Sequence, residues 1–180
     1  MKELSKVVFI QGAFDVINYG HVRAFAFAKS QGDYLIVGLN TNTLVKDYKR
    51  RRPVMPWWQK KKILEGFKHV DKVVKAPDFS PMKLLKKYKV DVYVISREWN
   101  WSKMRERAYM KKKGGRVCFS RRFKGISTTA IKLRLLEEYL AETNTEVLTK
   151  DNASLSLGYL SDQAAADIRK KFKVRGIKIS

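Results

Sequence analysis

Two short groups of residues near the amino terminus have the types and spacing of an anion-binding turn. Gly12-Ala13-Phe14-Asp15 follows an apolar run, and Asn18-Tyr19-Gly20-His21 opens a segment with helical spacing of apolar residues. Backbone N–H groups and the dipole at a helix N-terminus favour a bound phosphate. His21 on the first turn can add a charged donor, which would stabilise a transferring phosphoryl group in its transition state. On spacing alone, a loop glycine and a capping or surface histidine remain equally open.

A second candidate anion site follows the last apolar run of the chain. Arg121 and Arg122 precede Ser127 and Thr128, and these hydroxyl residues stand where a helix begins. They can hold phosphate oxygens, cap the helix, or do both. Between the two groups, Lys46 to Lys62 carries seven net positive charges. Such a run is usually a solvated face, but here some of its lysines could hold a triphosphate tail.

The apolar pattern predicts the scaffold that must position these groups. Continuous apolar runs indicate buried strands over residues 6–11, 34–39, 70–75, 91–95 and 116–120. Helical spacing indicates helices over 21–29, 57–67, 80–88 (with Ser80 as N-cap and Pro81 as first residue), 103–113, and from about 127. The basic segment from Lys46 is interrupted by two prolines. We interpret it as a connection that leads to the helix predicted over 57–67.

Apolar strands without inside–outside alternation, separated by helices, indicate a parallel sheet covered on both faces. We therefore predict an α/β fold with a Rossmann-like, doubly wound, parallel five-stranded sheet and a mainly helical C-terminal appendage. Ligands of such sheets bind beyond the carboxyl ends of the strands, where the strand order reverses. The loops after residues 11, 39, 95 and 120 are where we expect the chemistry.

Charge and composition narrow the class of protein further. Residues 1–136 hold 32 of the 39 basic residues and 10 of the 17 acidic ones, so the net charge of +22 belongs to this part of the chain. A detachable basic tail for nucleic acid is thereby disfavoured. The single Cys118 excludes an intrachain disulfide. The sequence contains no run of about 18 apolar residues and no apolar segment of signal-peptide length, so we expect a cytoplasmic protein without a membrane span.

Together these motifs resemble the cytidylyltransferase-like nucleotidyltransferase superfamily, in the branch of glycerol-3-phosphate cytidylyltransferases and heptose-phosphate nucleotidyltransferases. The resemblance runs from about Val7 to Leu135. Residues 12–15 and 19–21 are similar to Gly-x-Phe-Asp followed by His-x-Gly-His, and Lys49 with Arg52-Pro53-Val54 resembles the lysine and Arg-Pro-Val of the heptose branch. His69-Val70-Asp71 resembles a strand entry of the family. Residues 125–129 are similar to its Gly-Ile-Ser-Thr-Ser/Thr motif, with Arg122 three places before the glycine.

The resemblance implies attack by an acceptor phosphate on the α-phosphorus of CTP or ATP, with Mg²⁺ and with release of pyrophosphate. It implies that His21 stabilises the α-phosphoryl group, that Lys49 and less firmly Lys46 contact phosphates, and that Arg122, Ser127 and Thr128 hold the β- and γ-phosphates. The implied nucleotide-binding set also includes Gly12, Ala13, Phe14, Gly20, Lys60 and Trp99, and Asp15 would contact the acceptor or a metal. The acceptor would be a sugar, polyol or aminoalcohol phosphate, and a homodimer is expected.

Three positions depart from the pattern of the superfamily. Asn18 replaces the first histidine of His-x-Gly-His; an uncharged donor to phosphate there would cost ~1–2 kcal/mol and slow the step about ten- to thirtyfold. Lys60 replaces an arginine, which keeps the charge without the bidentate fork. Ser96-Arg97-Glu98-Trp99 replaces a glycine- and aspartate-containing motif, so the choice of nucleobase stays open. Trp99 could stack on a base, although an aromatic residue at a strand end more often packs against the protein.

Two alternatives remain for the function of the chain. A catalytically impaired transferase fold could bind nucleic acid through its basic surface, with an affinity that falls steeply with salt. Membrane association is the weaker alternative, since only Ala165 to Val174 is faintly amphipathic and basic. We predict a transferase core over residues 1–136 and a helical extension of unknown role over 137–180, with a short helix over 163–172.

Overall fold

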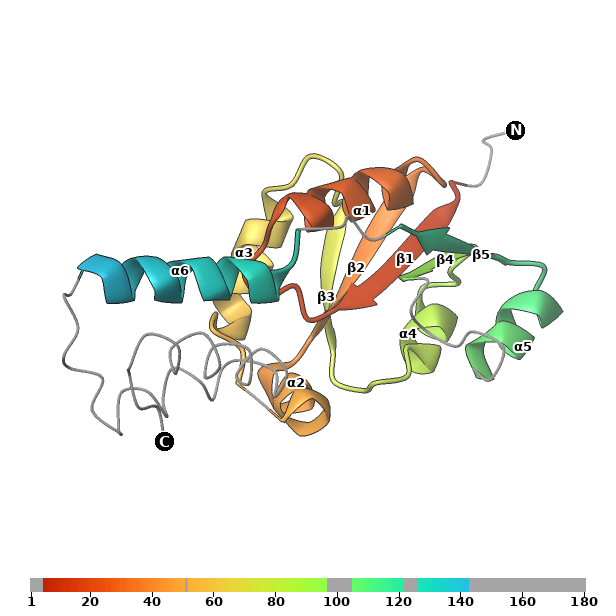
Figure 1. The fold of residues 1–180 in the computed structure, drawn as a ribbon. Coiled ribbons are helices and arrows are strands. Elements are labelled where there is room, and N and C mark those ends of the chain that lie inside the picture. Colours follow the sequence, from red (N-terminus) through yellow and green to blue (C-terminus); the bar gives the residue numbers. More distant parts are fainter. Residues whose placement is uncertain (1–4, 51, 97–104, 122–125, 143–180) are drawn as a thin grey trace.

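A computed structural model describes residues 5–50, 52–96, 105–121 and 126–142 of the chain. Five parallel strands form one sheet in the order β3-β2-β1-β4-β5 (Figure 1). The strands are β1 (Val7–Gly12), β2 (Tyr34–Asn40), β3 (Lys72–Ala76), β4 (Val92–Ser96) and β5 (Arg116–Ser120). This is the predicted doubly wound α/β fold, and each strand lies within two residues of its predicted bounds.

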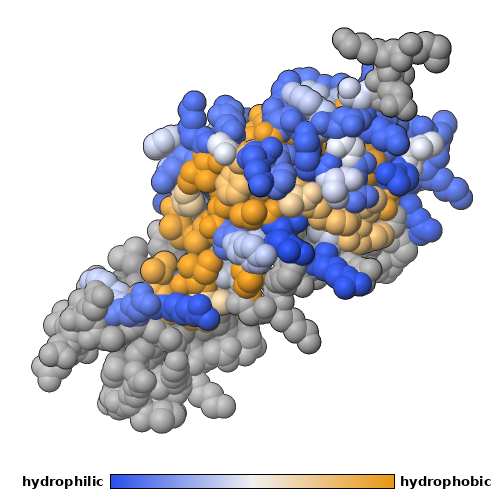
Figure 2. Space-filling view, turned by 90° about the horizontal axis from the view of Figure 1, so that it is seen from above, coloured by the Kyte–Doolittle hydropathy of each residue, from blue (hydrophilic) through white to orange (hydrophobic). Residues whose placement is uncertain are grey.

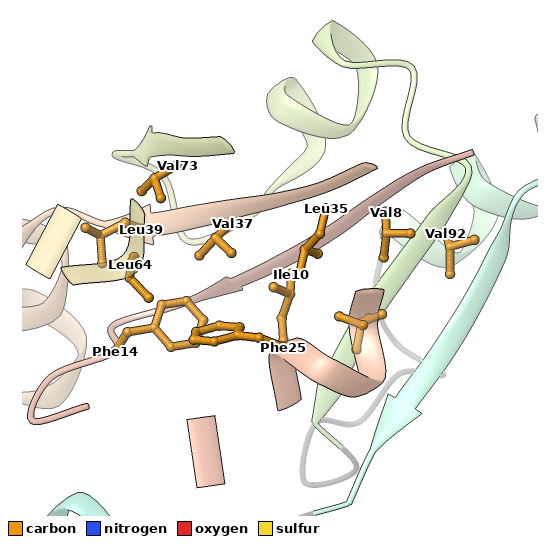
Figure 3. Packing of buried hydrophobic residues seen from close by; sticks show 12 residues of the cluster. Val8, Ile10, Phe14, Phe25, Leu35, Val37, Leu39, Leu64, Val73 and Val92 are labelled. Atoms are coloured by element: carbon orange, nitrogen blue, oxygen red, sulfur yellow. The ribbon is translucent and has the colours of Figure 1, made fainter. Parts of the chain in front are cut away.

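Two apolar clusters, one on each face of the sheet, hold the fold together. On one face, helices α1 (Tyr19–Lys29) and α3 (Trp57–Glu65) cover the sheet, and Phe14 and Phe25 pack against alternate residues of β1 and β2 (Figure 3). Helices α4 (Met82–Lys87) and α5 (Arg105–Lys112) cover the opposite face through Leu85 and Met110. Burial on both faces explains why the strands are apolar at consecutive positions rather than at alternate ones.

The close approach of β1 and β2 depends on a glycine in the middle of β2. A Cβ atom built on Gly38 would lie 2.5 Å from Cζ of Phe9, a fully buried residue of β1. No real Cβ contact is that short, so a larger residue would have to displace the Phe9 ring. The absence of a side chain at Gly38 therefore leaves room for the Phe9 ring on this face of the sheet.

The helices differ from the prediction mainly in the basic segment after β2. Helix α2 (Asn42–Lys49) was not predicted; Thr41 caps it by accepting a hydrogen bond from the backbone N of Leu44 at 3.1 Å, and Val45 is buried. Helix α4 begins one residue later than expected, at Met82. The hydroxyl of Ser80 lies 3.4 Å from Met82 N and also donates to Glu106, which is buried.

Helix α6 (Thr128–Glu142) projects from the side of the sheet (Figure 1). It continues past residue 136, the predicted end of the core, and residues 143–180, with their predicted helix, lie outside the described part of the chain. Its Leu135 and Tyr139 side chains are exposed.

On the face shown in Figure 2, hydrophobic residues form a band between hydrophilic ones. Within the described ranges, no helix is both long and apolar enough to cross a bilayer.

Candidate active site

A cleft of about 610 Å³ opens at the carboxyl edge of the sheet. The ends of four strands line it, with Ile10–Gly12 from β1, Asn40 from β2, Tyr93–Ser96 from β4 and Ser120 from β5. Strands β1 and β4 are neighbours at the point where the strand order reverses. From the sequence we predict that the loops after these four strands hold the reactive groups. The cleft brings the ends of the same four strands together.

The N-terminus of α1 forms one wall, and a reciprocal cap holds it in place. Asn18 is the N-cap residue: its Oδ1 accepts from the backbone N of Gly20 at 3.0 Å, while its own backbone N donates to Nδ1 of His21 at 3.1 Å. The Asn18 amide group donates to the Val16 carbonyl at 3.2 Å. The direct donation to phosphate expected for Asn18 therefore competes with the bond that its amide nitrogen already makes to Val16, while its amide oxygen caps the helix.

His21 is neutral in this structure at neutral pH, in contrast to the charged donor expected from sequence. Burial lowers its pKa, the positive charge of Lys49 lowers it further, and Asp15 opposes them only in part, so the pKa falls from 6.5 to about 4. Because Nδ1 accepts a hydrogen bond, the proton resides on Nε2. The imidazole packs edge-on against Phe14, with ring centroids 5.6 Å apart. His21 thus offers the cleft an oriented, neutral N–H donor.

The loop between β1 and α1 is strained and is held by the Asp15 carboxylate. Phe14 and Val16 have φ angles of 43° and 49°, which is unusual for residues with a Cβ and most of all for a β-branched one. Between them, Asp15 accepts from the backbone N atoms of Val54 and Met55 at 3.0 and 3.1 Å. These bonds anchor the loop at the residue between the two strained ones.

Asp15 is also joined to α6 through an ion pair. Nζ of Lys132 lies 3.2 Å from Asp15 Oδ2, and the two side chains are 9% and 11% exposed. Burial alone would raise the pKa of Asp15, but the two backbone donors and Lys132 outweigh it and hold the pKa below 3.8. Both carboxylate oxygens are engaged and Asp15 is not among the described cleft-lining residues, so in this structure it holds the loop to α6; the acceptor or metal contact proposed from sequence stays a prediction.

The N-terminus of α6 forms the facing wall of the cleft. Ser127 caps the helix by accepting from the backbone N of Ala130 at 3.1 Å. The Thr128 hydroxyl donates to the Asp15 carbonyl at 2.8 Å and lies 3.5 Å from the Asn18 amide nitrogen. Two helix N-termini from distant parts of the sequence therefore meet at one cleft, where their N–H groups and dipoles favour the same anion.

The lysines that the sequence proposes are separated by the structure. Lys49, the last residue of α2, lines the cleft, whereas Lys46 is exposed and does not. Lys60 is fully buried, and its Nζ donates to Oδ1 of Asn42 at 2.9 Å. Burial lowers the pKa of Lys60; the charge of Lys49 adds to this effect, and Asp15 opposes it. Lys60 lies one turn before Leu64 on the buried face of α3, so it does not reach the cleft as a phosphate contact.

The remaining predicted residues are either at the cleft or outside the described ranges. Gly12, Ala13, Phe14 and Gly20 line the cleft, although the Phe14 side chain itself belongs to the core. Arg122 and Trp99 lie outside the described residues.

The structure adds several polar and aromatic residues that sequence reasoning did not select as site residues: Gln11, Asn40, Tyr48, Phe79, Ser96 and Ser120. Arg121, the first residue of the arginine pair of the second candidate anion site, also lines the cleft. A polar residue at the end of an apolar strand, as in Gln11 and Asn40, is the sequence signal that could have found two of them.

Comparisons with known proteins identify the family of the chain. The sequence signature of the cytidylyltransferase-like family matches residues 9–134. A glycerol-3-phosphate cytidylyltransferase of Staphylococcus aureus is 33% identical over 131 residues, covering 72% of this chain and 95% of that protein. The bifunctional protein HldE of Citrifermentans bemidjiense is 32% identical over 135 residues, covering 74% of this chain but only 28% of that longer protein.

Among solved structures, a lipopolysaccharide core biosynthesis protein of Thermoplasma volcanium has the same fold. It superposes with a TM-score of 0.58 at 20% identity, covering 68% of this chain and all of that chain. A match at this identity speaks for the fold alone. The family signature and the relative from Staphylococcus aureus carry the assignment: this chain belongs to the cytidylyltransferase-like family and is a nucleotidyltransferase.

Proposed function

We propose that the chain transfers CMP or AMP from CTP or ATP to a phosphorylated small molecule, such as a sugar or polyol phosphate, and releases pyrophosphate. The observation that carries this proposal is the meeting of the α1 and α6 N-termini at one cleft beside His21 and Lys49. A triphosphate is the ligand that such a pair of anion sites suits best. The relatives named as cytidylyltransferases support the same chemistry.

In this mechanism the acceptor phosphate attacks the α-phosphorus in line, and the bond to pyrophosphate breaks. The protein needs no covalent intermediate, because positioning and electrostatics lower the barrier of such a transfer. His21 Nε2–H donates to an oxygen of the α-phosphoryl group as negative charge grows there. Lys49 supplies a positive charge beside it, and the α6 N-terminus with Ser127 and Thr128 holds the leaving phosphates.

Mg²⁺ would accompany the triphosphate and neutralise part of its charge. The described residues that line the cleft include no carboxylate, and no cluster of three His, Cys, Asp or Glu side chains occurs within the described ranges. These residues do not form a protein cage for the ion. The fit is instead to an ion held by phosphate oxygens and water, as Mg²⁺ with nucleotides commonly is.

Pyrophosphate release tests the proposal directly. The full chain with Mg²⁺ and CTP or ATP is assayed against a panel of sugar, polyol and aminoalcohol phosphates. Release must depend on one of these acceptors. Absence of release with both triphosphates across the whole panel would refute the proposed activity.

A set of histidine variants then tests the assigned role of His21. Loss of the donor in His21→Ala is expected to lower kcat about 10²–10³-fold. His21→Gln keeps a neutral N–H donor and should retain more turnover than His21→Ala. The control is His69→Ala, since His69 lies between α3 and β3 and is not among the cleft-lining residues. Equal turnover in His21→Ala and His69→Ala would remove His21 from the mechanism.

A further inference from the structure

Two buried amide oxygens in the cleft have no hydrogen-bond partner. They are Oε1 of Gln11 and Oδ1 of Asn40. Both residues line the cleft, and Asn40 is only 5% exposed. A buried polar atom without a partner costs stability, so a site that keeps two of them needs an explanation. A ligand that supplies the missing donors is the explanation that their position in the cleft favours.

The two oxygens lie on one face of the sheet and toward one end of the cleft. Gln11 follows Phe9 on the face of β1 covered by α4 and α5, and Asn40 follows Gly38 on the same face of β2. The amide group of Gln11 donates to the carbonyls of Asp78 and Phe79 at 3.0 and 3.3 Å. These two carbonyls fix the orientation of the amide, so that its oxygen is left as an acceptor.

The position of these residues assigns them to the acceptor rather than to the nucleotide. The α1 N-terminus with His21 lies on the face of the sheet that α1 and α3 cover, and the α6 N-terminus reaches the same loop through the bond from Thr128 to the Asp15 carbonyl. A triphosphate held by these two helix N-termini would lie toward that face, with the ends of β4 and β5 left for the nucleoside. Gln11 and Asn40 lie on the opposite face of β1 and β2, beside Phe79 and Tyr48, which leaves them for the second substrate.

The chemistry at this end of the cleft selects hydroxyl groups. An amide oxygen repels phosphate oxygens and binds only donors, so the acceptor must present O–H or N–H groups here. An ammonium group would lie near Lys49, and no carboxylate occurs among the described lining residues to balance its charge. Nζ of Lys49 lies 5.6 Å from the centroid of the Tyr48 ring, so one face of this ring already has a cation.

On the basis of the proposed function, we propose that Gln11 and Asn40 bind hydroxyl groups of the acceptor and select a polyhydroxylated phosphate over an aminoalcohol phosphate. The rings of Tyr48 and Phe79, packed edge to face at 5.5 Å, provide an apolar wall for the carbon chain or sugar ring. The acceptor phosphate then points away from the amides, toward His21 and the α-phosphorus.

The first test compares acceptors on the unmodified chain. Glycerol 3-phosphate and sugar 1-phosphates form one arm, and phosphoethanolamine and phosphocholine form the other. The hydroxylated arm is expected to give the higher kcat/KM, and removing a bound hydroxyl from the best acceptor should lower kcat/KM about tenfold or more. Equal or better activity with an aminoalcohol phosphate would overturn the inference while leaving the proposed transferase activity intact. Inactivity with every acceptor would instead refute the proposed activity.

The second test removes the two oxygens. Asn40→Leu and Gln11→Met are close in size to the native residues and are expected to raise the KM of the acceptor about tenfold, with the KM of the triphosphate unchanged. The matched control is Gln31→Met, because Gln31 lies outside the cleft near Cys118 and should leave both KM values unchanged. A rise in the KM of the triphosphate would mean that the amides bind the ribose, which overturns the assignment, as would unchanged KM values in both cleft variants.

A stability measurement gives a readout that needs no activity. Asn40→Leu removes the unpartnered oxygen together with the bond from the Asn40 amide nitrogen to the Tyr48 hydroxyl at 3.4 Å, so the informative quantity is the change that a ligand causes in each protein. The best acceptor of the first test should raise the midpoint of thermal unfolding of the unmodified chain more than that of Asn40→Leu, because a ligand stabilises the state that binds it. An equal rise in both proteins would count against a ligand-binding role for this residue.

Discussion

The buried imidazole of His21 should make the stability of the protein depend on pH, and one substitution should remove that dependence. His21→Gln is the suitable change, because glutamine at the third helical position can accept the same hydrogen bond from the Asn18 backbone N. The cap of α1 is then kept while the titrating group is lost. Any difference in pH dependence between the two proteins reports on the imidazole.

The size of the effect follows from the two pKa values of His21. Its pKa is about 4 in the folded protein, against an ordinary value of 6.5 in the unfolded chain. Between these values the unfolded chain binds a proton that the folded protein does not, so acid favours unfolding. The stabilisation is fully present above the unfolded pKa and is lost as the pH falls toward 4. Between pH 7 and pH 5 the loss is about 2 kcal/mol of unfolding free energy.

Urea unfolding at several pH values from 7 to 5 measures this loss. The unmodified chain should lose about 2 kcal/mol more than His21→Gln over that range. His69→Gln is the control, since it removes the other histidine of the sequence and should keep the steep profile of the unmodified chain. Parallel profiles for the unmodified chain and His21→Gln would show that the imidazole is not held neutral by burial, and the reasoning would fail.

Three further substitutions test the packing, the loop and the lysines. Gly38→Ala should lower the unfolding free energy by about 1–3 kcal/mol, because its Cβ would overlap the Phe9 ring; Gly66→Ala, whose nearest contact is at 3.4 Å, is the control in the same urea titration. Thr128→Val should cost about 1 kcal/mol in thermal unfolding through its lost hydrogen bond to the strained loop; an unchanged midpoint would contradict that bond. Lys49→Met should lower the affinity for the triphosphate about tenfold or more, measured by calorimetry, because Lys49 lines the cleft. Lys60→Met should lower this affinity far less, because Lys60 is buried away from the cleft. Equal losses would place Lys60 in the site.

The sheet could be predicted from sequence because its physical signal is local. Continuous apolar runs of strand length have few other interpretations when helices separate them, so the strands and their parallel arrangement were predicted correctly. Helix α2 was missed because charge and the nearby prolines dominate its segment. Thr41, which caps the helix, and Val45, which is buried, were the weak signals of this element.

The site could be predicted only in part because side-chain partners are set by the tertiary structure. Lys60 has the positive charge that a phosphate contact needs. It lies one helical turn before Leu64 on the buried face of α3, however, so its side chain points into the interior. Asp15 matches a motif, yet its partners come from Val54, Met55 and Lys132, far along the chain. No spacing rule reveals such partners.

Several expectations stay predictions. They are the homodimer, the cytoplasmic location, the need for Mg²⁺, the choice between CTP and ATP, the division at residue 136, and the roles of Arg122 and Trp99. The exposed Leu135 and Tyr139 side chains of α6 are the natural place to look for a contact with a second copy.

The Asp15 carboxylate also has a consequence for the order in which the protein assembles. Its ion pair with Lys132 closes a chain segment of 117 residues, longer than the 84 residues that separate the paired Val8 and Val92 of β1 and β4. Contacts of the longest range form late, because the chain must lose much of its freedom before they can form. The link between the strained loop and α6 should therefore form after the sheet, whereas the bonds from Val54 and Met55 close only 39 and 40 residues and can form earlier. Hydrogen exchange at the Val54 and Met55 amides, compared with exchange in α6, would report this order.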